Sequence, residues 1–113
     1  MKIVTVCRAG LCRSVALADV LKLHYENTDV IPLGVSFNSD EVKNMLFNWA
    51  DKIILLQKEY VDRIPHEFSS KILVCDVGPD VWNNPKHPEL ISRVWNWTRD
   101  NQELNLVEHS KIL

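Results

Sequence analysis

The fold is decided by the stretch Lys2-Ile3-Val4-Thr5-Val6-Cys7, followed by Arg8-Ala9-Gly10-Leu11-Cys12 and then Arg13-Ser14. The first six residues are short and rich in β-branched side chains, so we expect a buried strand. Apolar side chains then recur at helical spacing through Leu17, Val20 and Leu21, which predicts a helix over residues 13–26. The residues between strand and helix must therefore form a tight loop.

The same alternation of strand and helix continues along the chain. Apolar runs predict strands over 30–35, 52–56 and 71–75, and Pro32 places the first of these at an edge of the sheet. Helices are expected from a cap at Asn38, Ser39 or Asp40 to about Ala50, over 58–64, and from Pro88 onward. Such a pattern is typical of an α/β fold. We predict one domain over residues 1–113, with a four-stranded parallel sheet and helices on both faces.

The last expected helix has a distinct apolar side. At about 100° per residue, one arc collects Leu90, Ile91, Val94, Trp95, Trp97 and Thr98. We therefore assign the two tryptophans of this helix to the core and not to a recognition surface.

Composition excludes several classes of protein. The 113 residues suffice for one domain, and 46% hydrophobic residues with a net charge of −2 describe an ordinary globular chain. The sequence contains no basic run of the kind that predicts nucleic-acid binding, and its apolar runs are far shorter than the roughly 20 residues of a membrane span. The N-terminus lacks the features of a signal peptide, and three cysteines do not suggest a disulfide framework. We expect a cytoplasmic monomer.

The first strand–helix junction has the features of an anion-binding loop. Parallel sheets bind ligands where strands end and helices begin. Here the loop contains the small residues Ala9 and Gly10, and Gly10 can adopt a positive φ without steric cost. Backbone N–H groups and the positive end of the helix dipole would then converge on one point.

The pattern Cys7-x5-Arg13 followed by Ser14 adds chemistry to this loop. Nearby donors and an arginine favour a thiolate at Cys7, which can attack phosphorus. Arg13 can hold two phosphoryl oxygens, and Ser14 can hydrogen-bond the thiolate. The alternative is a buried cysteine beside an ordinary helical arginine, but an arginine in the first turn opposes the helix dipole. Cys12 fits either packing or a protective disulfide with Cys7.

The sequence also resembles a known family. Residues 6–14 are similar to the phosphate loop of the low-molecular-weight protein tyrosine phosphatases, Val-Cys-x-Gly-Asn-x-Cys-Arg-Ser-Pro. Residues 49–56 resemble the approach to that family's third strand, and residues 76–82 resemble its Asp-Pro-Tyr loop. Residues 88–91 resemble the start of the last helix in a compact bacterial and phage branch. Ala9-Gly10 replaces the family's Gly-Asn, and Val15 replaces its proline.

The resemblance implies a role for each matching residue. Cys7 would be the nucleophile, Arg13 the phosphate-binding arginine and Asp80 the general acid. Trp82 would form a wall for the substrate ring. Phosphate would be bound by the rest of the loop and the hydroxyl that follows it, namely Arg8, Ala9, Gly10, Leu11, Cys12 and Ser14.

Some residues allow an alternative reading. Asp76 lies in the same loop as Asp80, and either is also suited to a turn or a cap. The resemblance favours Asp80. His24, His66 and His87 lack metal-ligand spacing, so we assign them surface or core roles and expect no metal or cofactor.

We therefore expect a metal-independent phosphomonoesterase that acts on phosphotyrosine in a protein, or on a small aryl phosphate, through a phosphocysteine. One alternative is an arsenate reductase of the same fold, which needs a thiol relay, and only Cys75 lies downstream in an apparent core strand. A second is a non-catalytic module that binds oxyanions or phosphoproteins. A phosphocysteine carrier is a third, although such carriers lack an arginine equivalent to Arg13.

Overall fold

The computed structural model describes residues 1–101, 104 and 106. The chain alternates strands and helices in the order β1 (Lys2–Cys7), α1 (Arg13–His24), β2 (Asp29–Gly34), α2 (Asp40–Trp49), β3 (Lys52–Leu55), the 3₁₀ helices η1 (Lys58–Arg63) and η2 (His66–Lys71), β4 (Ile72–Val74) and α3 (Pro88–Asp100).

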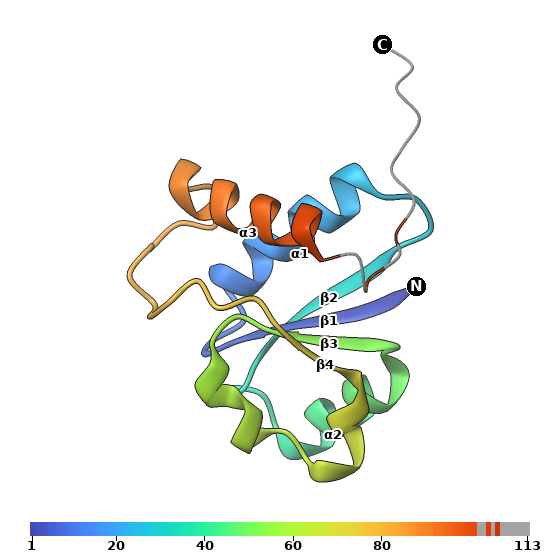
Figure 1. The fold of residues 1–113 in the computed structure, drawn as a ribbon. Helices are drawn as coiled ribbons and strands as arrows, with labels where there is room; N and C mark the ends of the chain where they lie inside the picture. The colour runs from blue at the N-terminus through green and yellow to red at the C-terminus, as the bar shows by residue number, and fades with distance from the viewer. Residues whose placement is uncertain (102–103, 105, 107–113) are drawn as a thin grey trace.

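The four strands form one parallel sheet in the order β2-β1-β3-β4. Helices α1 and α3 cover one face, and α2 lies with the two 3₁₀ helices on the other (Figure 1). The predicted parallel sheet with helices on both faces is confirmed. Because all four strands are parallel, the loops that follow β1, β2, β3 and β4 all lie at the carboxyl end of the sheet.

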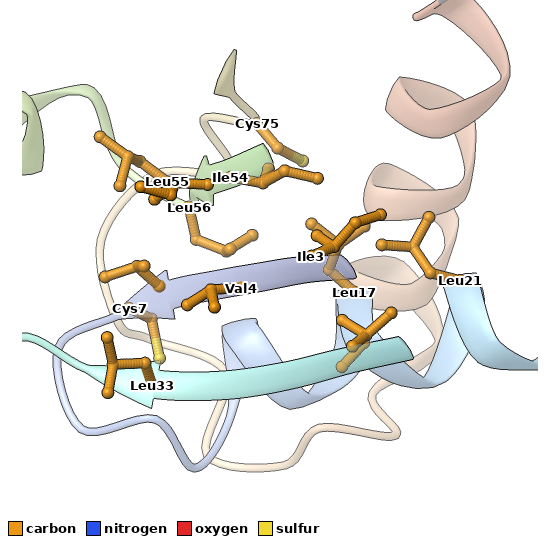
Figure 2. Close-up of a cluster of buried hydrophobic side chains, with 14 of the residues drawn as sticks. Ile3, Val4, Cys7, Leu17, Leu21, Leu33, Ile54, Leu55, Leu56 and Cys75 are labelled. Carbon is orange, nitrogen blue, oxygen red and sulfur yellow. The ribbon is translucent and has the colours of Figure 1, made fainter. Parts of the chain in front are cut away.

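The core is built around β1, one of the two interior strands of the sheet. Ile3, Val4 and Val6 are fully buried. Leu17 and Leu21 of α1 are buried as well, and Figure 2 shows them near Ile3. β-branched and leucine side chains fill both faces of the sheet, which explains why these strands show no polar alternation.

Helix α3 packs its apolar arc inward. Leu90 and Val94 are fully buried, while Trp95 and Trp97 are half-buried and packed against the core. The Trp97 indole N–H donates to the carbonyl of Val74 at 2.8 Å. Both tryptophans therefore belong to the core side of the helix, as predicted.

Strand β2 lies at the edge of the sheet, as Pro32 predicted. The N–H of Asp29 donates to Met1 at 2.9 Å, and that of Val35 donates to Cys7 at 2.9 Å. Since N–H directions alternate along a strand, odd-numbered residues of β2 face β1. The nitrogen of Pro32 therefore faces away from the sheet, where it interrupts no hydrogen bond of the ladder.

The segment between β3 and β4 differs from the expectation. The helix predicted over 58–64 is the 3₁₀ helix Lys58–Arg63, and a second 3₁₀ helix, His66–Lys71, was not predicted. Pro65 separates the two, because it cannot continue a helix. Of the three candidate caps for α2, Ser39 is the one used, and its Oγ accepts from the N–H of Val42 at 3.2 Å.

None of the helices in the part of the chain described here combines the length and the apolar character that crossing a membrane requires.

Candidate active site

The loop after β1 is held against the end of β2. The carbonyl of Arg8 accepts from the N–H of Ser36 at 3.0 Å, which extends the pairing beyond the strands. Gly10 has φ of +75°, and a Cβ added there would lie 2.7 Å from the nitrogen of Gly34. A Cβ added to Gly34 would lie 2.4 Å from the carbonyl carbon of Ala9. Two glycines therefore allow the loop and the strand end to touch backbone to backbone.

The Cys7 sulfur lies among hydrogen-bond donors. The thiol donates to Ser14 Oγ at 3.1 Å, and a thiolate would accept the same bond from the hydroxyl. The N–H of Gly10 donates to the sulfur at 3.3 Å. Burial alone raises the pKa of Cys7, but the bonds from the Ser14 hydroxyl and from the backbone of Ser14, Gly10 and Cys12 outweigh it and lower the pKa. Cys7 therefore has the environment of a reactive thiol.

The start of α1 fixes the far end of the loop. Cys12 is the N-cap residue, and Arg13 and Ser14 are the first two residues of the helix. The buried Thr5 hydroxyl donates to the carbonyl of Ser14 at 2.8 Å. This bond ties the first turn of α1 to the middle of β1, so the helix N-terminus points into the loop.

All three cysteines are free. Burial and the charge of Asp80 raise the pKa of Cys12, against a backbone hydrogen bond from Asn84. Burial raises the pKa of Cys75, which is 1% exposed and belongs to the core, as predicted. Whether Cys7 and Cys12 join under oxidation stays a prediction.

Arg13 is the most deeply placed charge of the site, with 1% exposure. Its Nη1 donates to Gln57 Oε1 at 2.7 Å and to the carbonyl of Gly78 at 2.8 Å. Its Nη2 donates to the hydroxyl of Tyr60 at 2.9 Å. Its buried Nε has no hydrogen-bond partner among the described residues. An unpaired buried guanidinium nitrogen is costly, so this edge of the side chain is suited to an anionic ligand.

The two candidate acids have different surroundings. Asp80 Oδ1 lies 3.9 Å from Arg13 Nε, and the Asp80 side chain is 39% exposed. Asp76 instead accepts from the N–H of Lys58 at 3.2 Å and from that of Gly78 at 2.8 Å. Asp76 therefore shapes the turn after β4, while Asp80 forms an ion pair at the Nε edge of Arg13.

Trp82 packs against the start of α3. Its ring meets the ring of His87 edge-on at 5.2 Å, and the Arg93 guanidinium lies 5.2 Å from its centroid. His87 is the N-cap of α3, and its Nδ1 accepts from the N–H of Glu89 at 3.2 Å. The indole nitrogen of Trp82 is buried without a hydrogen-bond partner in the described part of the chain. The contact between Asn84 and Cys12 brings this loop to the phosphate loop.

The remaining predicted residues lie at the surface or in packing contacts. Arg8 and Leu11 are exposed, Leu11 at 74%. His66 is exposed, and His24 stacks on Trp95 with ring centroids 4.2 Å apart. Within the described ranges, no three His, Cys, Asp or Glu side chains are grouped to hold a metal ion.

Sequence reasoning missed four residues that contact or shape the site. Thr5 is hidden in an apolar strand, and Gly34 and Tyr60 gave no local signal. Gln57 directly follows the last residues of the β3 run, at the sheet edge where ligands bind, so its position was a usable clue.

Comparison with known proteins identifies the fold. No family model and no curated protein matches the chain. Among solved structures, a low-molecular-weight protein tyrosine phosphatase from Streptococcus pyogenes has 20% sequence identity and a TM-score of 0.69, covering 97% of this chain and 94% of its own. Wzb of Vibrio vulnificus, solved with benzylphosphonate, has 19% identity and a TM-score of 0.65, covering 88% and 98%. A mutant of the YwlE arginine phosphatase with a phosphorylated active-site serine has 15% identity and a TM-score of 0.63, covering 88% and 95%.

The alignment with this chain covers nearly the whole length of each of these structures. The similarity is therefore to a complete domain and not only to a shared strand–loop–helix unit. The chain therefore has the fold of the low-molecular-weight protein tyrosine phosphatases, as the sequence resemblance predicted.

Proposed function

We propose that this protein is a cysteine-dependent phosphatase that hydrolyses aryl phosphates, with phosphotyrosine in proteins as the main substrate class. The observation that carries the proposal is that Cys7, whose pKa is lowered by surrounding donors, shares the loop with a buried Arg13 whose Nε has no hydrogen-bond partner among the described residues. Phosphoryl transfer to sulfur requires a nucleophile and, beside it, a group that binds two phosphoryl oxygens, and this loop supplies both.

In the first step, the Cys7 thiolate attacks phosphorus and forms a sulfur–phosphorus bond. The bond from phosphorus to the aryl oxygen breaks, and its electron pair stays on that oxygen. A protonated Asp80 gives the oxygen a proton, so that a neutral phenol leaves. The loop N–H groups and Arg13 stabilise the charge on the other three oxygens. Asp80 is suited to this role because its carboxyl is partly exposed at the edge of Arg13, while that of Asp76 is engaged in a turn.

In the second step, water attacks the phosphocysteine and Asp80 takes its proton. The sulfur–phosphorus bond breaks, and the Cys7 thiolate and inorganic phosphate are regenerated. The Ser14 hydroxyl, 3.1 Å from the sulfur, stabilises the thiolate as it leaves. The loop atoms thus serve both halves of the reaction.

The fold similarity supports phosphatase activity, and the benzylphosphonate complex of Wzb supports an aryl substrate. Arsenate reduction fits less well. Its thiol relay would have to use Cys75, which is 1% exposed and whose pKa is raised by burial.

The decisive experiment is turnover of para-nitrophenyl phosphate with and without a chelator, in the intact chain and in Cys7→Ser. We expect turnover that survives chelation and is lost in the serine variant, while inorganic phosphate still binds. Phosphate binding without turnover would indicate a binding module. Turnover that is abolished by the chelator would indicate a metal hydrolase.

Arg13→Lys is a second test of the same proposal. A lysine keeps the charge but loses the planar fork, so kcat/KM should fall by roughly 10²-fold or more. Near-normal kinetics in this variant would remove Arg13 from the site.

A further inference from the structure

The guanidinium of Arg13 is oriented by groups that lie outside the phosphate loop. An arginine has five N–H donors. Gln57 and the carbonyl of Gly78 take both hydrogens of Nη1, and Tyr60 takes one hydrogen of Nη2. The two N–H groups that remain are on Nε, which has no hydrogen-bond partner among the described residues and lies 3.9 Å from Asp80 Oδ1, and on Nη2, which shares one edge of the guanidinium with Nε. That edge can bind two oxygens of one phosphoryl group side by side.

The acceptors around Arg13 are themselves fixed. Tyr60 is 9% exposed in η1, and the Arg13 guanidinium carbon lies 5.8 Å from its ring centroid. The Gln57 amide nitrogen donates to Glu59 Oε1 at 3.2 Å, which turns the amide oxygen toward Arg13. Both residues follow β3, whose last residues lie beside the end of β1. The orientation of Arg13 is therefore set by residues that directly follow β3.

We propose that Tyr60 and Gln57 are positioning residues that direct the Nε–Nη2 edge of Arg13 toward the bound phosphoryl group. This inference rests on the proposed function, because it assigns the loop to a phosphate. Without these acceptors, the long arginine side chain could present another edge of its guanidinium to the ligand. Holding the donors in place before the ligand arrives removes that ordering cost from binding and from the transition state.

The carbonyl of Gly78 adds a second consequence. It belongs to the loop that carries Asp80, and it accepts from the same Nη1 as Gln57. If Arg13 rotates, this carbonyl loses its donor and the acid loop loses an anchor. Loss of the Tyr60 or Gln57 acceptor should therefore lower kcat as well as weaken phosphate binding.

The test compares the two tyrosines of the chain. Tyr60→Phe removes only the hydroxyl that holds Arg13. Tyr25→Phe is the matched control, because Tyr25 is also buried but lies at the far end of α1, where its ring is tilted against that of Trp95 with centroids 6.2 Å apart. Binding of inorganic phosphate is measured by the protection of Cys7 from alkylation with iodoacetamide, with the modified residue identified by peptide mapping. This readout does not require turnover.

We expect Tyr60→Phe to weaken phosphate binding and to lower kcat for para-nitrophenyl phosphate, each by about 10-fold. Tyr25→Phe should leave both unchanged. Unchanged phosphate affinity and kcat in Tyr60→Phe would overturn the proposal. Should Tyr60→Phe fail to fold, Gln57→Leu takes its place with the same expectation, since Gln57 is only half-buried.

A double-mutant cycle separates positioning from a purely structural role. In an Arg13→Lys background, Tyr60→Phe should weaken phosphate binding by less than 2-fold or so, because the fork that it orients is gone. A full, additive loss in that background would refute action through Arg13. Phosphate binding without turnover in the unsubstituted protein would defeat the proposed function and leave the positioning inference standing. The absence of phosphate protection in the unsubstituted protein would overturn the inference as well.

Discussion

Replacing Gly34 by alanine tests whether the close contact between the phosphate loop and β2 is needed for activity. The added Cβ would lie 2.4 Å from the carbonyl carbon of Ala9 and 2.5 Å from its oxygen. Carbon atoms in good contact are about 3.5 Å apart. The backbone at Ala9 must therefore shift by about 1 Å, because neither atom belongs to a flexible side chain.

The shift acts on stability and on activity. Overpacking of this kind costs about 1–3 kcal/mol, which for a domain of this size corresponds to a fall of about 10 °C in Tm. Ala9 precedes Gly10, whose N–H donates to the Cys7 sulfur at 3.3 Å. A misplacement of about 1 Å at such a group can cost about 10²-fold in rate. We expect kcat/KM to fall by about that factor.

The measurements are thermal unfolding by circular dichroism and turnover of an aryl phosphate well below the Tm of every variant. Ser36→Ala is the matched control. It lies two residues further along, its side chain is exposed, and its backbone bond to Arg8 is retained. This control should change stability by less than about 0.5 kcal/mol. Wild-type Tm and wild-type turnover in Gly34→Ala would refute the steric argument.

Four further predictions concern the reacting groups. Ser14→Ala should raise the pKa of Cys7, so the acid limb of the pH–rate profile should move to higher pH; an unmoved limb would mean that the hydroxyl does not stabilise the thiolate. Because the pKa of Cys7 is lower in the folded protein, ionisation of its thiol adds stability above the unfolded thiol pKa of about 8.5, and urea titrations should show this contribution disappear as pH falls through the folded pKa. Asp80→Asn should lower kcat by roughly 10²–10⁴-fold for a phenyl ester with a poor leaving group and less for a good one; the same dependence in Asp76→Asn alone would reverse the assignment. Mild peroxide should abolish turnover reversibly, and Cys12→Ser should make the loss permanent; peptide mapping that finds a sulfinic acid on Cys7 with free Cys12 would contradict a protective disulfide.

Local sequence was sufficient to predict the sheet and the position of the loop that carries Cys7 and Arg13. The buried strand Lys2–Cys7 and the helix from Arg13 follow from periodicity, and the Cys7-x5-Arg13 spacing is a local pattern. Edge placement of β2 followed from Pro32, because a proline cannot donate in a central strand. These features depend on neighbours within a few positions.

The contacts of Arg13 could not be predicted in the same way. Gln57 and Tyr60 are 44 and 47 residues from Arg13, and only the crossover from β1 to β3 brings them together. The 3₁₀ helix η2 was missed because such a short element carries little periodicity. Gly34 gave no signal either, since its role is to leave space for Ala9, and that contact exists only after the loop has formed.

The edge strand β2 also bears on how the protein behaves at high concentration. A free strand edge invites pairing with another chain, which begins aggregation. On the outer side of β2, the donors would be the nitrogens of Val30, Pro32 and Gly34. Pro32 has no N–H, and that of Gly34 is taken by Asn38 Oδ1 at 2.8 Å.

Only one outward donor of the strand is left for a neighbouring molecule. Gly34 thus has two roles. Its missing side chain leaves space for Ala9, and its N–H donates to Asn38 within the same chain and not to a neighbouring molecule. Pro32 and Asn38 together act as gatekeepers against intermolecular β-sheet formation, and changing them would open a templating edge without touching the chemistry of the loop.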